Sequence, residues 1–98
     1  MIHNVYIRPI TMHEQITRPY VAAYVCVDYK GQCILQYSVS KKGVELWSAG
    51  KSHDLIKLCN DTADEIIPLI DSGWTVEANA DEDGFQLRRP AEKEKTND

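Results

Sequence analysis

A few short stretches of this sequence carry residues that could do chemistry. The first, Ser52-His53-Asp54, holds the serine, histidine and carboxylate of a hydrolytic triad. Consecutive residues of a helix point about 100° apart, so these side chains cannot line up hydroxyl to imidazole to carboxylate. We therefore interpret Ser52 as a helix N-cap and Asp54 as an acidic residue of the first turn.

An acidic stretch near the C-terminal end has the spacing of a calcium-binding loop. Asn79, Asp81, Asp83 and Gly84 match positions one, three, five and six of an EF-hand loop. Position twelve should supply a bidentate glutamate, but Pro90 stands there. The residues on either side also alternate like strands, so we expect an acidic hairpin tip rather than a metal site.

The remaining thiols and imidazoles do not form a recognisable site. The three cysteines make an odd count without a C-x-x-C spacing, which favours reduced, mostly buried thiols; they are Cys26, Cys33 and Cys59. His3, His13 and Glu14 could ligate a metal only if loops brought them together. Because no nucleophile, base or ligand set can be named, we expect no enzymatic activity, cofactor or metal.

Length and charge narrow the class of protein. The chain has 98 residues, 43% hydrophobic and 27% charged, which corresponds to one small domain. A net charge of −4 argues against a generally basic nucleic-acid coat protein. The charge is uneven, because residues 1–51 hold six Lys/Arg against three Asp/Glu and residues 52–98 hold five against twelve.

The sequence also predicts a location. The longest apolar run, from about Tyr20 to Val27, is too short to cross a bilayer. The first residues lack a basic region followed by an apolar stretch and a small-residue cleavage site. We therefore expect a cytoplasmic protein that does not bind membranes.

Alternating apolar residues predict the first strands. Residues 4–9, 20–28 and 32–40 read as strands, and 10–18 as a loop. A three-residue loop, Tyr29-Lys30-Gly31, pairs Asp28 with Gln32 and keeps one face of this hairpin apolar. In this register Cys26 and Cys33 lie on opposite faces, which argues against a disulfide between them.

The second half predicts one more hairpin strand, a helix and a final hairpin. Lys42-Gly43 permits a turn into a strand at 44–48. Helical spacing of apolar residues begins after Ser52 and stops at Gly73. Pro68 would kink this helix, or the capping-box spacing at 62–65 would split it. Strands at 74–80 and 85–89 follow, joined by a turn at Asp83-Gly84.

These elements predict an α+β fold in the order β-β-β-β-α-β-β. The expected architecture is an antiparallel sheet of five to six strands with one long or kinked helix packed on one face. Residues 1–90 would form a single domain, and residues 91–98 a flexible polar tail.

The helix can cover only one face of such a sheet. The other face would carry an unusually aromatic set of side chains: Tyr6, Arg8, Tyr24, Cys26, Ile34, Gln36 and Trp47. Aromatic residues and arginine are enriched at protein interfaces, so this face is a candidate surface for another protein or for a second copy in a homodimer. Two alternatives remain open. Residues 10–18 or the tail could cover the face, or its aromatic and basic residues could bind nucleic acid.

The acidic half offers a second candidate surface. Its predicted partner-binding residues are Asp61, Asp64, Glu65, Asp81, Glu82 and Asp83. Such a surface could occupy a basic groove of a partner, or it could be an ordinary solvated face.

The layout as a whole resembles small phage and prophage accessory proteins. The shared features are stacked hairpins, one acidic helix ending in Asp71-Ser72-Gly73-Trp74 and no catalytic motif, over residues 1–90. That group includes inhibitors of bacterial defence systems, so the resemblance implies a protein that binds and blocks a host protein. We therefore expect a non-enzymatic protein-interaction module, with a nucleic-acid-binding protein as the alternative.

Overall fold

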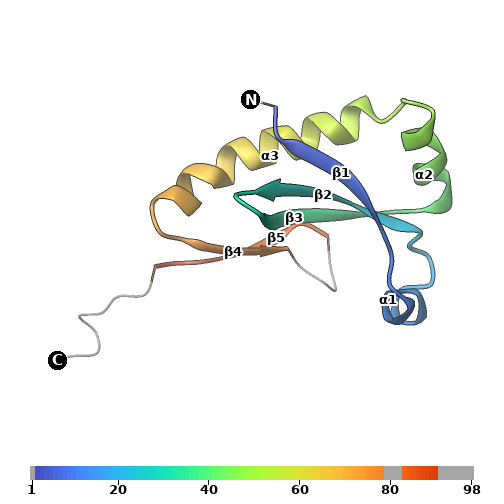
Figure 1. Cartoon of the computed structure of the whole chain (residues 1–98), viewed down its shortest axis with the longest axis horizontal. Helices are drawn as coiled ribbons and strands as arrows, with labels where there is room; N and C mark the ends of the chain where they lie inside the picture. Colours follow the sequence, from blue (N-terminus) through green and yellow to red (C-terminus); the bar gives the residue numbers. More distant parts are fainter. Residues whose placement is uncertain (1, 79–82, 91–98) are drawn as a thin grey trace.

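A computed structural model describes residues 2–78 and 83–90 of the chain. The fold is α+β (Figure 1). Its elements are β1 (Asn4–Pro9), α1 (Met12–Thr17), β2 (Ala23–Tyr29), β3 (Gln32–Val39), α2 (Lys41–Ser48), α3 (His53–Asp71), β4 (Thr75–Ala78) and β5 (Phe85–Arg88). The predicted strands at 4–9, 20–28, 32–40, 74–80 and 85–89 therefore correspond to observed strands with different bounds. β2 begins three residues later than predicted, and residues 79–80 lie outside the described residues.

The prediction of one sheet with five to six strands and one helix is wrong. The described residues form a three-stranded sheet in the order β1-β2-β3 and a separate hairpin of β4 and β5, both antiparallel, together with three helices. Among the described residues the two sheets share one isolated bridge, where Gly84 N donates to Gln36 O over 2.6 Å and Gln36 N to Gly84 O over 3.1 Å. Gln32 Nε2 of β3 also donates to Val76 O of β4 over 2.7 Å. One bridge does not extend into a ladder, so the sheets stay distinct.

The segment predicted as a fourth strand is the helix α2. Ser40 lies in an extended conformation before it and accepts a hydrogen bond from Gly43 N over 3.2 Å, which caps the helix. Val44 and Trp47 are three residues apart, so a helix places them on one face, and Trp47 packs against the core. The alternation at 44–48 suggested a strand, but capping and packing favour the helix.

The segment predicted as a loop at 10–18 contains α1. Its N-terminus is a capping box, in which Glu14 N donates to Thr11 Oγ1 over 3.1 Å and Thr11 N donates to Glu14 Oε1 over 2.8 Å. These reciprocal bonds stabilise a helix of only six residues. Figure 1 places α1 beyond the end of β1, away from α3.

The hairpin of β2 and β3 has a shorter turn than predicted and a bulge. Lys30 and Gly31 form a two-residue turn with φ of 53° and 80°, and Tyr29 pairs with Gln32. The register then shifts after Val27, which pairs with Leu35. Because the bulge absorbs one residue of β3, the apolar face of the hairpin is preserved although the loop length differs.

The long helix α3 is continuous from His53 to Asp71 with Pro68 inside its last turn, so it is not split. Ser52 occupies the N-cap position, as predicted, but its side chain makes no capping hydrogen bond. The predicted stop is confirmed: Gly73 adopts φ of 109°, and Trp74 N donates to Leu69 O over 3.0 Å.

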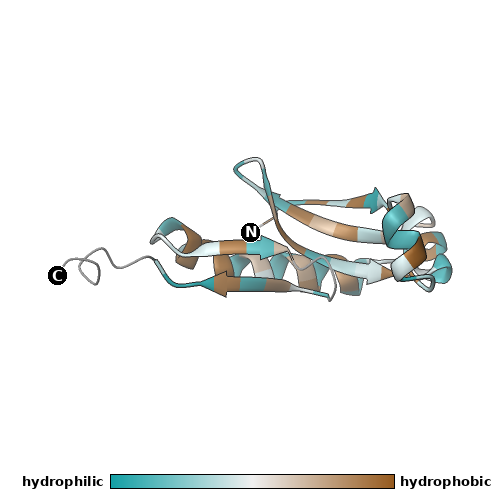
Figure 2. Cartoon of the chain, turned by 90° about the horizontal axis from the view of Figure 1, so that it is seen from below, coloured by the Kyte–Doolittle hydropathy of each residue, from teal (hydrophilic) through white to brown (hydrophobic). Residues whose placement is uncertain are grey.

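The core lies between α3 and the strands. Cys59, Ala63 and Ile66 of α3 are its buried helix residues, and the strands contribute the rest: Val25, Val27, Ile34, Leu35 and Val76. Figure 2 shows these hydrophobic stretches in brown along the strands and the long helix. In the described part of the chain, no helix has the length and apolar character needed to cross a membrane.

Candidate functional site

The predicted aromatic face exists on the three-stranded sheet, on the side opposite the buried Val25 and Val27. Tyr6 lies beside Cys26 and Arg8 beside Tyr24 across β1 and β2, and Cys26 lies beside Gln36 across β2 and β3. Five of the predicted residues are therefore brought together. Their role in partner binding stays a prediction.

Two residues predicted for this face lie elsewhere. Ile34 stands at the bulge of β3 and belongs to the buried hydrophobic core. Trp47 projects from α2 and packs on that core, because the strand that would have placed it on the sheet face does not form.

The centre of this face is covered by the protein itself. Tyr24, Cys26 and Gln36 are buried, so they do not present an open surface. The Arg8 guanidinium lies 4.7 Å from the centroid of the Tyr24 ring, and Arg18 Nη1 donates to the Tyr24 hydroxyl over 3.2 Å. Two residues of the 10–18 segment therefore contact this face, Arg18 at Tyr24 and Glu14 at Arg8.

A two-pronged ion pair joins this face to α1. Arg8 Nη1 donates to Glu14 Oε1 over 3.1 Å and Arg8 Nη2 to Glu14 Oε2 over 3.0 Å. This hydrogen bonding lowers the pKa of Glu14 to about 2, well below the usual value of a glutamate. The Arg8 guanidinium and the Glu14 carboxylate therefore bind each other.

The three thiols are free, as predicted. The bulge places Cys33 on the same face as Cys26, contrary to the predicted register. A hydrogen bond from Cys33, with a smaller contribution from Arg8, lowers the pKa of Cys26 to about 7, and the same interaction raises the pKa of Cys33. Burial raises the pKa of Cys59 to about 11. Cys26 is fully enclosed. Although its lowered pKa favours the thiolate, a substrate could not reach the sulfur.

The predicted acidic residues do not form one continuous surface in the described structure. Asp61, Asp64 and Glu65 are exposed on α3; Asp61 Oδ2 pairs with Lys57 over 2.6 Å, and Asp64 Oδ1 lies 2.7 Å from His3 Nε2. The hydrogen bond with His3 lowers the pKa of Asp64.

Asp83, another of the predicted acidic residues, lies beside the three-stranded sheet and not on α3. Asp83 accepts a hydrogen bond from Ser38 N over 2.9 Å and lies 3.8 Å from Arg18 Nη2, next to the three-stranded sheet. Asp81 and Glu82, together with Asn79 of the calcium-like spacing, lie outside the described residues, as does the predicted tail at 91–98. The acidic side stays a prediction as a binding surface.

The structure reveals an exposed apolar group that the sequence analysis missed. Met12, Ile16 and Tyr20, which we call the α1 apolar group, expose 79%, 74% and 91% of their surface. Two features of the sequence indicate a helix here. Thr11-x-x-Glu14 has capping-box spacing, and Met12 and Ile16 are four residues apart. The prediction of a loop at 10–18 concealed that Met12 and Ile16 project from a helix, with Tyr20 in the turn that follows it.

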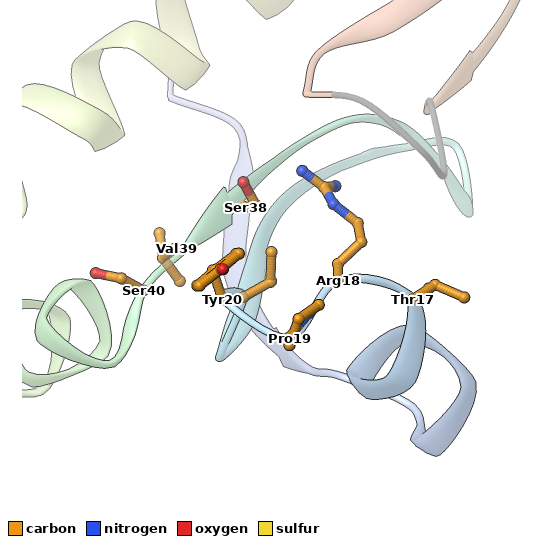
Figure 3. A pocket seen from close by; sticks show the side chains of 8 residues that line it. Thr17, Arg18, Pro19, Tyr20, Ser38, Val39 and Ser40 are labelled. Carbon is orange, nitrogen blue, oxygen red and sulfur yellow. The ribbon is translucent and has the colours of Figure 1, made fainter.

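A pocket of about 430 Å³ adjoins this group (Figure 3). One wall consists of residues 17–21, including Pro19 and Tyr20, and the other of residues 38–40 at the end of β3. Ala22 N donates to Val39 O over 2.8 Å and holds the walls together at one side. The pocket therefore continues the α1 apolar group towards α2.

The chain was compared with known proteins at the level of family, sequence and structure. No family model matches it, and neither a curated protein nor a solved structure does. The resemblance to phage accessory proteins thus stays a prediction from layout.

Proposed function

We propose that this protein is a non-enzymatic, cytoplasmic interaction module that binds and inhibits another protein through the end of the molecule formed by α1. The observation that carries the proposal is the exposure of the α1 apolar group, Met12, Ile16 and Tyr20, beside a pocket. Exposed apolar surface of this kind is stabilised when a partner covers it, by about 25 cal/mol for each Å² buried.

The geometry supports binding more than catalysis. The thiol whose pKa is lowered, Cys26, is enclosed, and Arg8 and Glu14 are paired with each other. The proposal of inhibition comes from the resemblance in layout to small phage accessory proteins. A partner site covered by the α1 end would be blocked for other ligands.

The nucleic-acid alternative has less support from the geometry. Base stacking needs an exposed ring face, but Tyr24 is buried under Arg8 and Arg18. The Tyr6 hydroxyl donates to Asp28 Oδ1 over 3.0 Å, which ties that ring to the sheet. This alternative stays a prediction.

The experiment is comparative affinity capture from the source cells. The double variant Ile16→Ser/Tyr20→Ser should retain the circular dichroism of the parent and lose most of the captured partner, by about tenfold or more. The matched control is Ile56→Ser/Leu58→Ser, which changes two exposed apolar residues of α3 and should capture the partner as the parent does. Equal capture by the two variants would contradict the proposal.

A further inference from the structure

Three cationic residues line the pocket next to the α1 apolar group or directly follow one of its lining residues in the chain. Arg18 forms part of its wall. Lys41 and Lys42 follow directly after the lining residue Ser40; both are exposed, and neither forms an ion pair with any residue that the structure describes. The first turn of α2 contains no acidic residue.

Two acidic groups near these cations are already engaged, whereas Glu45 of α2 is exposed one helical turn after Lys41. Glu14 of α1 is held by Arg8 in the two-pronged ion pair. Asp83 lies 3.8 Å from Arg18 and offsets part of its charge, but Lys41 and Lys42 keep theirs. The pocket thus has apolar walls at Pro19, Val21 and Val39, and the two exposed lysines at the start of α2 follow its last lining residue, Ser40.

We propose that the pocket seats an acidic segment of a partner protein that carries one large apolar or aromatic anchor. The anchor enters between Tyr20 and Val39, and the carboxylates of the segment face Lys41, Lys42 and Arg18. A volume of about 430 Å³ suits one such side chain together with adjoining backbone. The positive charges of these residues attract an acidic segment and repel a basic one. The inference deepens the proposed function and rests on it.

Other occupants fit less well. A second copy could offer the acidic face of α3. Such a contact joins two different surfaces of the same chain, so it continues from copy to copy into a filament unless the copies close into a ring. Nucleic acid would meet the same cations, but the apolar pocket walls suit an apolar side chain better than a phosphate.

The test uses the full chain and three fluorescein-labelled peptides. The first alternates glutamate and leucine around a central tryptophan; the second replaces glutamate by lysine; the third replaces tryptophan by serine. We expect the first to bind about tenfold more tightly than the others by anisotropy, and to shift the backbone amide signals of residues 17–22 and 38–42 in an NMR titration.

Charge-reversed variants test the two lysines at the start of α2. Lys41→Glu/Lys42→Glu should weaken binding of the first peptide about tenfold, whereas Lys57→Glu, which reverses an exposed lysine of α3, should change it less than about twofold. Equal binding of the lysine peptide, or shifts confined to α3, would overturn the inference. So would tighter binding of a short oligothymidylate to the same amides, or a self-association that Lys41→Glu/Lys42→Glu abolishes.

Partner capture separates this inference from the proposed function. Loss of the partner in both Ile16→Ser/Tyr20→Ser and Lys41→Glu/Lys42→Glu supports both. Loss in the first variant alone overturns the acidic segment and leaves the interaction module intact. Capture that neither variant changes contradicts both.

Discussion

At the scale of single residues, Arg8 explains why the sheet face behaves differently from the prediction. Its guanidinium binds both carboxylate oxygens of Glu14 and covers the ring of Tyr24. A residue expected to meet a partner is therefore used inside the molecule, where it ties β1 to α1. The same pair makes stability depend on pH.

Replacing Glu14 by glutamine tests this ion pair. Glutamine can still accept the Thr11 amide bond but not the charge-assisted pair, so the free energy of unfolding at pH 7 should fall by about 1–2 kcal/mol, allowing for partial exposure. The pKa of Glu14 is about 2 in the folded protein, below its value of 4.5 in model compounds. Its contribution is therefore complete above about pH 4.5 and disappears as the pH falls towards 2. Urea unfolding across this range measures the difference, and a difference independent of pH would contradict the assignment.

The thiols provide a second test at this scale. Cys26 and Cys59 are buried and Cys33 is partly exposed, so a bulky thiol reagent should modify only Cys33 in the native protein and all three thiols in urea. Reaction of Cys33 should be slow near pH 7 because its pKa is raised. The variant Cys33→Ser should lose the native reaction, and Cys59→Ser should keep it. Rapid native modification of Cys26 would show that the sheet face opens.

At the scale of elements, helix N-capping residues identify two helices that the hydrophobic pattern alone does not predict. Both helices that the sequence analysis missed begin with a capping residue, Thr11 for α1 and Ser40 for α2. The helix it predicted, α3, begins at Ser52 without a capping bond and depends instead on burial of its apolar face. Capping should therefore matter more for α2 than for α3.

This difference predicts the effect of two serine substitutions. Ser40→Ala removes the bond to Gly43 N and should lower the free energy of unfolding by about 1 kcal/mol. Ser52→Ala removes no such bond and should cost less than about half of that. Thermal or urea unfolding of the two variants measures the contrast; equal effects would mean that the Ser40 bond does not stabilise α2.

At the scale of the whole molecule, the uneven charge becomes a spatial arrangement. The exposed lysines at the start of α2 directly follow a residue that lines the pocket, whereas Asp61, Asp64 and Glu65 are exposed along α3. A partner guided by charge therefore meets two different surfaces, and the sign of its own charge selects between them.

Neutralising the α3 acids distinguishes these surfaces. If the partner presents an acidic segment to the α1 end, Asp61→Asn/Glu65→Gln should raise its association rate by about twofold at low salt, because long-range repulsion decreases. The effect should vanish near about 0.5 M salt, where charges are screened. Stopped-flow association with the captured partner measures the rate. Slower association would favour the acidic side as the binding surface instead.

The sequence alone predicted much of the fold through signals between neighbours in the chain. Alternation predicted most of the strands, helical spacing and Gly73 predicted α3 and its end, and the parity of the β2–β3 hairpin placed Tyr24 and Cys26 on one face. The sequence did not predict the helix α2, because the apolar residues in a run of only eight residues fit the spacing of a strand as well as that of a helix. The N-cap and the packing distinguish the two.

Tertiary structure decided which surfaces are available. Whether Tyr24 is open or covered depends on Arg8 and Arg18, and how the final hairpin meets the first sheet depends on contacts such as the bridge between Gln36 and Gly84. These contacts join residues from different elements, and no local pattern records them. The sequence by itself therefore determined the class of fold and its free thiols, whereas the exposed α1 apolar group and its pocket follow only from how the chain packs, because exposure is a property of the assembled surface.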